Sequence, residues 1–200
     1  GKLTPGLHSE ILDADTKQRL EDLYLPYKQK RRTKAQIARE AGLTPLADAL
    51  LDDPALTPEV EAAKYIDADK GVADTKGALD GARQILMERF AEDAALLGEL
   101  RERMYDEGIT VAAVIDGKEE AGAKFRDYFS YSEAIREIPS HRALALFRGR
   151  NEDVLRLALK MPDELQDPPL PSPCERRVAA RFGIRDEKRP ADRWLLETAR

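Results

Sequence analysis

The chain has 200 residues, with 42% hydrophobic and 36% charged side chains, a composition typical of a globular protein with a core and a charged surface. A single cysteine excludes an intramolecular disulfide framework, and there is no run of about 18 apolar residues, so we expect a cytoplasmic protein with no membrane contact. The formal net charge of -5 excludes a uniformly basic nucleic-acid-binding protein, although a local group of cations could still attract a polyanion.

Short helices joined by tight turns are predicted in the first third of the chain. Three of them are expected to begin at a Thr-Pro pair, at Thr4-Pro5, Thr44-Pro45 and Thr57-Pro58. In such a pair the threonine caps the helix and the proline suits its first turn. Another helix should stop near Tyr24, because Pro26 restricts the residue before it, and a further one should run from Thr33 to a glycine cap at Gly42.

A basic turn follows Pro26 and supplies the first group of candidate nucleic-acid-binding residues. These are Tyr27, Lys28, Lys30, Arg31, Arg32, Lys34 and Arg39. The cations would neutralise phosphates and a tyrosine ring would stack on a base. In the alternative, Tyr24 and Tyr27 pack the corner and the cations are only solvated, or the acidic segment from Glu40 to Ala62 folds back and neutralises them.

The strongest helical periodicity runs from Asp74 to Glu107. Its apolar stripe consists of Leu79, Ala82, Leu86, Phe90, Ala94, Leu97, Leu100 and Met104. Steps of three and four residues predict one long helix or two abutting helices with a break at Glu92-Asp93, and the stripe is assigned to the core. The glycines in this segment are expected to mark close packing or that break.

A change to β-branched residues follows Gly108. Ile109 to Ile115 is predicted to be a strand, Val154 to Leu159 is a second candidate, and Lys124 to Tyr131 suits either a strand or a helix. We therefore expect a mainly α fold, a multi-helical array with at most a small β element, with any sheet around 109–131 and 154–159. The aromatic side chains of this region are assigned to the core rather than to a base-stacking platform.

A helix predicted after Pro139 carries the second group of candidate nucleic-acid-binding residues, Arg142, Arg148 and Arg150. Guanidinium groups around Gly149 could grip a phosphate, because arginine presents a fixed fork of donors and glycine allows close approach. In the alternative, Arg148 and Arg150 pair with Glu152, Asp153 or the acidic segments and brace the fold.

Four prolines between Gln166 and Pro173 predict a stiff connector. We therefore expect a helical core at 1–165, a proline-rich connector at 166–173, and basic amphipathic helices at 174–200 that lead to a further domain. Two histidines and one cysteine cannot supply the usual four-ligand zinc set, and no phosphate loop or nucleophile arrangement is present. We expect a non-catalytic protein with no metal site and no cofactor.

Three blocks of sequence resemble the Tex family of bacterial transcription accessory proteins. They run from Leu20 to Arg39, from Gly117 to Tyr128 and from Pro139 to Asn151. The resemblance implies an N-terminal helical fragment of a longer protein that continues into RNase-H-like, helix-hairpin-helix and RNA-binding domains. It also implies a cytoplasmic role in transcription, with RNA or DNA, RNA polymerase or ribosome-associated machinery, and the downstream domains of the same chain as partners. The fragment then either contributes to nucleic-acid binding or is a helical scaffold and protein-interaction module.

Overall fold

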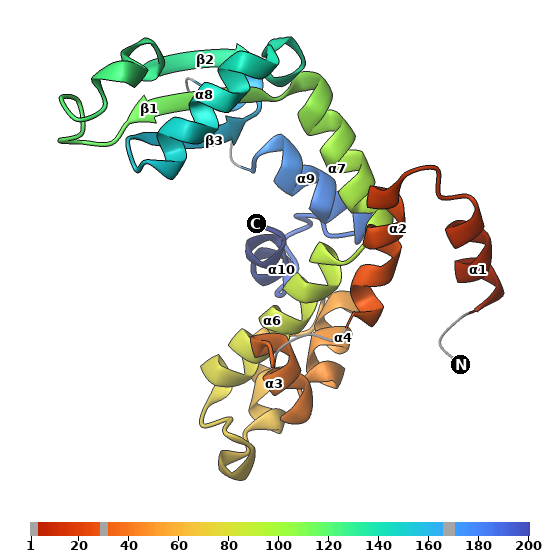
Figure 1. Ribbon diagram of the computed structural model, residues 1–200. Helices are drawn as coiled ribbons and strands as arrows, with labels where there is room; N and C mark the ends of the chain where they lie inside the picture. Colours follow the sequence, from red (N-terminus) through yellow and green to blue (C-terminus); the bar gives the residue numbers. More distant parts are fainter. Residues whose placement is uncertain (1–3, 29–31, 166–170) are drawn as a thin grey trace. The chain divides into compact units, whose positions relative to one another are not determined.

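A computed structural model describes residues 4–28, 32–165 and 171–200, and the chain divides into two compact units. The first unit comprises Gly1–Gly98 and Cys174–Arg200, and the second comprises Glu99–Pro173. Helices and strands carry the labels of Figure 1. Within the described residues, every helix is too short or too polar to cross a lipid bilayer.

The first unit is helical. Its α-helices are α1 (Pro5–Leu12), α2 (Lys17–Tyr24), α3 (Lys34–Glu40), α4 (Thr44–Asp52), α5 (Pro58–Ala62), α6 (Thr75–Ala91), α9 (Pro173–Arg181) and α10 (Asp192–Ala199). Short 3-10 turns are η1 (Leu25–Tyr27), η2 (Ala63–Tyr65) and η3 (Ala68–Lys70). Helix α6 ends at Ala91 and α7 (Ala94–Glu107) begins three residues later, so the predicted break at Glu92-Asp93 is confirmed. The boundary between the units falls within α7, after Gly98.

Side-chain caps start several of these helices. The hydroxyl of Thr4 accepts a hydrogen bond from the Leu7 N–H, and Thr33 does the same for the Gln36 N–H. The predicted cap at Thr44 is wrong, because α4 begins at Thr44 itself. The preceding Gly42 has a φ of 84° and ends α3, and the Leu43 N–H donates to the Ala38 carbonyl. Because of this turn, Leu43 has helical backbone angles and occupies the N-cap position of α4, where its side chain makes no capping hydrogen bond.

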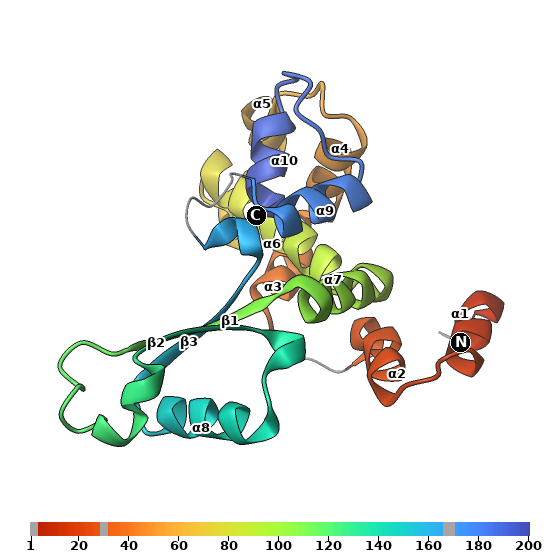
Figure 2. The same cartoon turned by 90° about the horizontal axis from the view of Figure 1, so that it is seen from above.

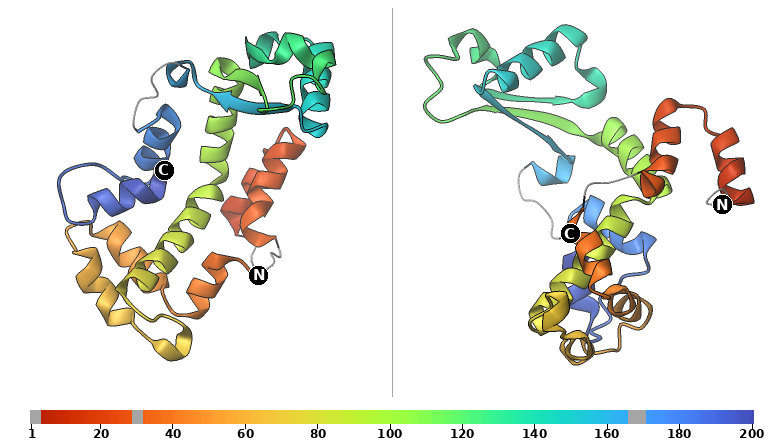
Figure 3. Two further views of the ribbon diagram at one scale, coloured as in Figure 1. Left: turned by 90° about the vertical axis from the view of Figure 1, so that its left-hand side faces the viewer. Right: turned by 60° about the horizontal axis from the view of Figure 1, so that its bottom comes forward.

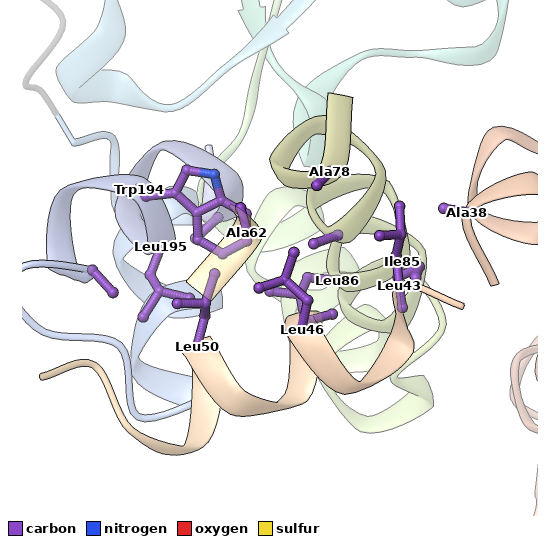
Figure 4. Close-up of a cluster of buried hydrophobic side chains, with 14 of the residues drawn as sticks. Ala38, Leu43, Leu46, Leu50, Ala62, Ala78, Ile85, Leu86, Trp194 and Leu195 are labelled. Carbon is purple, nitrogen blue, oxygen red and sulfur yellow. The ribbon is translucent and has the colours of Figure 1, made fainter. Parts of the chain in front are cut away.

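Helix α6 is the centre of the first unit, with α3 and α4 alongside it (Figure 3). In Figure 4, leucines of α4 and α6 face α10, where Trp194 and Leu195 complete the cluster. Leu46, Leu50 and Leu86 are fully buried. A Cβ added at Gly81 would lie 2.3 Å from Cδ1 of Leu43, so this glycine allows close packing at α6, as predicted.

The two units follow a different division from the ranges predicted from the sequence. Residues 174–200 pack with residues 1–98, because Trp194 and Leu195 enter the same core as α4 and α6. Most of the predicted connector, 166–170, lies outside the described residues. That 174–200 leads to a further domain stays a prediction.

The second unit contains a small antiparallel sheet, so the fold is mainly α with a minor β element, as expected. Its strands are β1 (Ile109–Val114), β2 (Ser130–Ala134) and β3 (Leu155–Lys160), in the order β2-β1-β3. Helix α8 (Ser140–Asn151) lies along one side of the sheet (Figure 2). The remaining turns are η4 (Ala123–Tyr128), η5 (Ile135–Glu137) and η6 (Pro162–Glu164). The segment from Lys124 to Tyr131 is thus a 3-10 helix followed by the start of a strand.

The core of the second unit lies between α8, η4 and the sheet. Ala112 of β1 pairs with Leu157 of β3, and Phe125 and Leu146 are buried in the same cluster. The other aromatic side chains of this region, Tyr128, Phe129 and Tyr131, pack against this cluster, so the assignment of these aromatics to the core is confirmed.

Candidate nucleic-acid interface

The predicted basic turn begins where α2 ends at Tyr24, as expected. The chain continues as one 3-10 turn through Pro26, and the Lys28 N–H closes it by donating to the Leu25 carbonyl at 3.3 Å and to the Tyr24 carbonyl at 3.1 Å. Pro26 suits this place because it fixes its own φ and needs no hydrogen-bond acceptor. The turn thereby presents Tyr24, Tyr27 and Lys28 at a short, well-defined corner of the first unit.

Two tyrosine rings at this corner are open to solvent. Tyr24 is 57% exposed and Tyr27 is 37% exposed, and Leu20, one helical turn before Tyr24, is 45% exposed. Neither ring stacks on another aromatic ring among the described residues. The alternative in which both tyrosines pack the corner therefore does not hold, and both side chains are accessible to solvent.

The cations of the first group fall into three classes. Lys28 and Lys34 are exposed, and their side chains make no hydrogen bond or ion pair with the residues that the structure describes. Arg32 and Arg39 are engaged by acids. Lys30 and Arg31 lie outside the described residues.

The ion pairs of Arg32 and Arg39 reduce the local positive charge. Arg32 donates from Nη2 to Oε2 of Glu40 at 2.6 Å, and this hydrogen bond, with a weaker one from Gln36, holds the pKa of Glu40 below its ordinary value. Arg39 pairs with Glu88, which also accepts from the Thr33 hydroxyl at 3.1 Å. The predicted neutralisation by the acidic segment thus occurs in part, through Glu40.

A pocket of about 250 Å³ lies behind this corner. Its lining consists of Pro26, Lys28, Thr33, Gln36, Arg39, Glu88 and Glu92. Two carboxylates face two cations here, so a phosphate inside the pocket would meet as much negative as positive charge. A polyanion would therefore contact the outer surface of the corner, where the tyrosines and Lys28 are exposed.

The second predicted group lies on α8 in the second unit. Arg142 donates from Nη1 to Oε1 of Glu133 at 2.8 Å, and the Tyr131 hydroxyl donates to the other oxygen of Glu133. The hydrogen bond from Tyr131, and then the one from Arg142, hold the pKa of Glu133 below its ordinary value. Burial and the Glu133 carboxylate raise the pKa of Tyr131. Arg142 therefore braces α8 against β2.

Arg148 and Arg150 do not make the predicted pairs with Glu152 or Asp153. Glu152 instead pairs with Lys124, at 2.5 Å. Arg148 is exposed, and among the described residues it has no hydrogen bond or ion pair. Arg150 makes one long hydrogen bond, 3.5 Å to Oδ1 of Asn151, and its guanidinium lies 5.2 Å from the centre of the Phe147 ring.

Sequence reasoning did not find Glu88 as the partner of Arg39 and Thr33. The signal is absent from the local sequence because Glu88 belongs to α6, far along the chain, and meets α3 only through packing. The two predicted groups of cations belong to different units, so each group is a separate candidate site. In the described part of the chain, no three His, Cys, Asp or Glu side chains are arranged to hold a metal ion.

Comparison with known proteins gives matches over most or all of the chain. A family model described as Tex central region-like matches residues 53–200. The chain is 58% identical over 194 residues to protein YhgF of Escherichia coli, covering 97% of the chain and 25% of YhgF. It is 50% identical over 205 residues to protein tex of Bordetella pertussis, covering 100% and 26%. S1 RNA-binding domain-containing protein 1 of Homo sapiens is 32% identical over 175 residues, covering 84% of the chain and 17% of that protein. The chain thus spans about a quarter of the length of these bacterial relatives.

Proposed function

The chain belongs to the Tex family, and from this premise we propose that its first unit contributes a contact to single-stranded nucleic acid within a transcription accessory protein. The name of a Neisseria gonorrhoeae relative, transcriptional accessory protein Tex, supports the setting, and the name of the human relative supports RNA as the ligand. The proposed role is non-catalytic, in a protein of the cytoplasm. RNA polymerase or ribosome-associated machinery and further domains of the same chain are its proposed partners.

The observation that carries this proposal is the exposure of Tyr24 and Tyr27 beside Lys28, with the exposed Lys34 at the start of α3. Stacking of a base on an aromatic ring contributes about 1–3 kcal/mol and requires an open ring face. Both tyrosines are accessible to solvent, and the two lysines are available for phosphates. Stacking also requires an unpaired base, so the corner suits single strands rather than duplex.

The paired arginines contribute less to this contact. Arg32 and Arg39 would have to leave Glu40 and Glu88 before they could neutralise a phosphate. Lys30 and Arg31 remain predicted contacts of the same corner. Arg142, Arg148 and Arg150 remain predicted contacts of the second unit, with Arg142 engaged by Glu133.

A second candidate function is a helical scaffold and protein-interaction module, with nucleic acid bound by other domains. The specific observation in its favour is that Arg32, Arg39 and Arg142 each pair with an acid inside the fold. Under this alternative the exposed tyrosines would contact protein.

Fluorescence anisotropy with labelled single-stranded RNA and duplex DNA separates the two functions. We expect binding to single strands that weakens from about 50 mM to about 200 mM salt, because each neutralised phosphate of a single strand adds about 0.7 to the salt slope. Replacing Lys28 and Lys34 together by Ala should lower that slope by about 1.4, whereas the exposed control Lys76→Ala should leave it unchanged. No binding at the lower salt concentration would leave the scaffold as the function.

A further inference from the structure

A second pocket, of about 250 Å³, lies between α8 and β3 in the second unit and has no part in the nucleic-acid contact proposed for the first unit. Its lining is Thr110, Ile138, Ala143, Leu146, Phe147, Arg150, Leu157, Ala158 and Leu159. Only Thr110 and Arg150 in this lining are polar. Phe147 is 49% exposed and Leu159 is 56% exposed, so the apolar floor continues to the surface. A volume of this size accepts one or two large apolar side chains.

The pocket reaches the open edge of the sheet. Strand β3 pairs with β1 and, among the described residues, with no other strand. Leu157, Ala158 and Leu159 are consecutive, and in a strand consecutive side chains point to opposite faces. All three line the pocket, so it runs along β3, which is the edge strand. An unpaired edge of this kind accepts an added strand through main-chain hydrogen bonds.

The rim of the pocket carries positive charge. The guanidinium of Arg150 lies over the Phe147 ring and has no carboxylate partner among the described residues. No acid occurs from Ile138 to Asn151. Of the acids nearby, Glu133 is held by Tyr131 and Arg142, and Glu152 pairs with Lys124. The exposed acids Glu137 and Asp153 make no ion pair with Arg150.

We propose that this groove, defined by the pocket lining, binds an extended acidic and apolar segment of a protein partner. The segment adds beside β3, places one large apolar side chain in the pocket and sets a carboxylate against Arg150. An Arg-carboxylate pair at the rim of an apolar pocket is a common basis of peptide recognition. The apolar lining favours this occupant over nucleic acid, since a phosphate backbone would find only one cation there.

Two labelled synthetic peptides of about ten residues test the proposal by anisotropy with the whole chain. One alternates Leu, Phe and Leu with Glu and has Asp at both ends, and the other has Lys at every acidic position. We expect the acidic peptide to bind at least about tenfold more tightly than the basic one. Arg150→Glu should reverse that preference, whereas Arg148→Glu, on the same helix but outside the lining, should keep it.

A second pair of variants tests the apolar floor. Phe147→Ser should weaken the acidic peptide at least about fivefold, and the matched control Leu144→Ser, which is 68% exposed on the same helix and outside the lining, should not. If Phe147→Ser fails to fold by circular dichroism, the charge reversal at the exposed Arg150 still decides the question.

Three results overturn the proposal. The first is equal binding of both peptides, or a preference that Arg150→Glu does not change. The second is displacement of the acidic peptide by a single-stranded oligonucleotide that binds with the same dependence on Arg150 and Phe147, which would make the groove a nucleic-acid site. The third is self-association in sedimentation experiments that Phe147→Ser abolishes, which would make the occupant a second copy of the chain. Replacing Tyr24 and Tyr27 by Ala should leave peptide binding intact, so this inference and the proposed function fail separately.

Discussion

Replacing Glu40 by Gln should strengthen nucleic-acid binding, because it releases a cation at the corner of the first unit. In the structure Glu40 holds Arg32 with hydrogen bonds of 2.6 Å from Nη2 and 3.1 Å from Nε. The Arg32 guanidinium, followed by the Gln36 amide, keeps the pKa of Glu40 below its ordinary value, so the carboxylate is charged at neutral pH. Glutamine keeps the shape of the side chain and removes its charge.

The size of the effect follows from counterion release. One more neutralised phosphate adds about 0.7 to the salt slope for single strands, which amounts to about eightfold tighter binding near 50 mM salt and about threefold near 200 mM. The pair is exposed, with 68% of the Arg32 side chain and 45% of the Glu40 side chain accessible, so thermal stability should change little.

Anisotropy titrations of Glu40→Gln with labelled single-stranded RNA at several salt concentrations measure this gain. Glu59→Gln is the matched control, because Glu59 is exposed and has no partner among the described residues. This substitution removes the same charge at a position away from the corner. An unchanged salt slope in Glu40→Gln, or the same gain in Glu59→Gln, would refute the assignment of Arg32 to the contact surface.

Two further predictions concern the packing that holds each unit together. The side chain of Asp192 is fully buried and accepts hydrogen bonds from the N–H groups of Glu187 and Arg189 at 2.8 and 2.9 Å. Asp192→Ala should therefore destabilise the first unit by about 2–4 kcal/mol, measured by urea unfolding with Trp194 fluorescence. Burial would raise the pKa of Asp192, but the Arg189 guanidinium and these N–H groups outweigh it and lower that pKa. The stability that Asp192 contributes is therefore complete above the ordinary carboxyl range and should disappear as the pH falls through the lowered pKa. A stability difference between wild type and variant that persists in acid would contradict this. In the second unit, a Cβ at Gly149 would lie 2.5 Å from Cδ1 of Leu155. Gly149→Ala should therefore lower the stability of this unit by about 1–3 kcal/mol through overpacking, which exceeds the gain of about 1 kcal/mol in helix propensity. The loss should appear as faster amide hydrogen exchange in β3. Slower exchange in β3 would show that α8 has room to move.

Local chemistry made much of the fold predictable. The turn at Pro26, the cap at Thr33, the glycine end at Gly42 and the break at Glu92-Asp93 each depend on residues within a few positions of one another. Strand β1 was predictable because β-branched residues follow Gly108 directly.

Partners brought together by packing were not predictable. The sequence separates Arg39 from Glu88 and Arg142 from Glu133, so which cations stay available had to come from the structure. The placement of 174–200 in the first unit is another case, since an amphipathic helix such as α10 shows an apolar face but not what that face meets. The exposure of Tyr24, which excludes its packing into the corner, likewise could not be known before the fold.

Photo-crosslinking of the whole chain to a uridine-rich single-stranded RNA, with mass spectrometric identification of the linked residues, tests the central claim most directly. We expect crosslinks at Tyr24 or Tyr27, whose exposed rings are proposed to stack on bases, and none at Tyr105, which is equally exposed at 57% but lies on α7 without the basic turn. Crosslinks confined to the second unit, or none at RNA concentrations that saturate binding, would contradict a nucleic-acid contact at this corner.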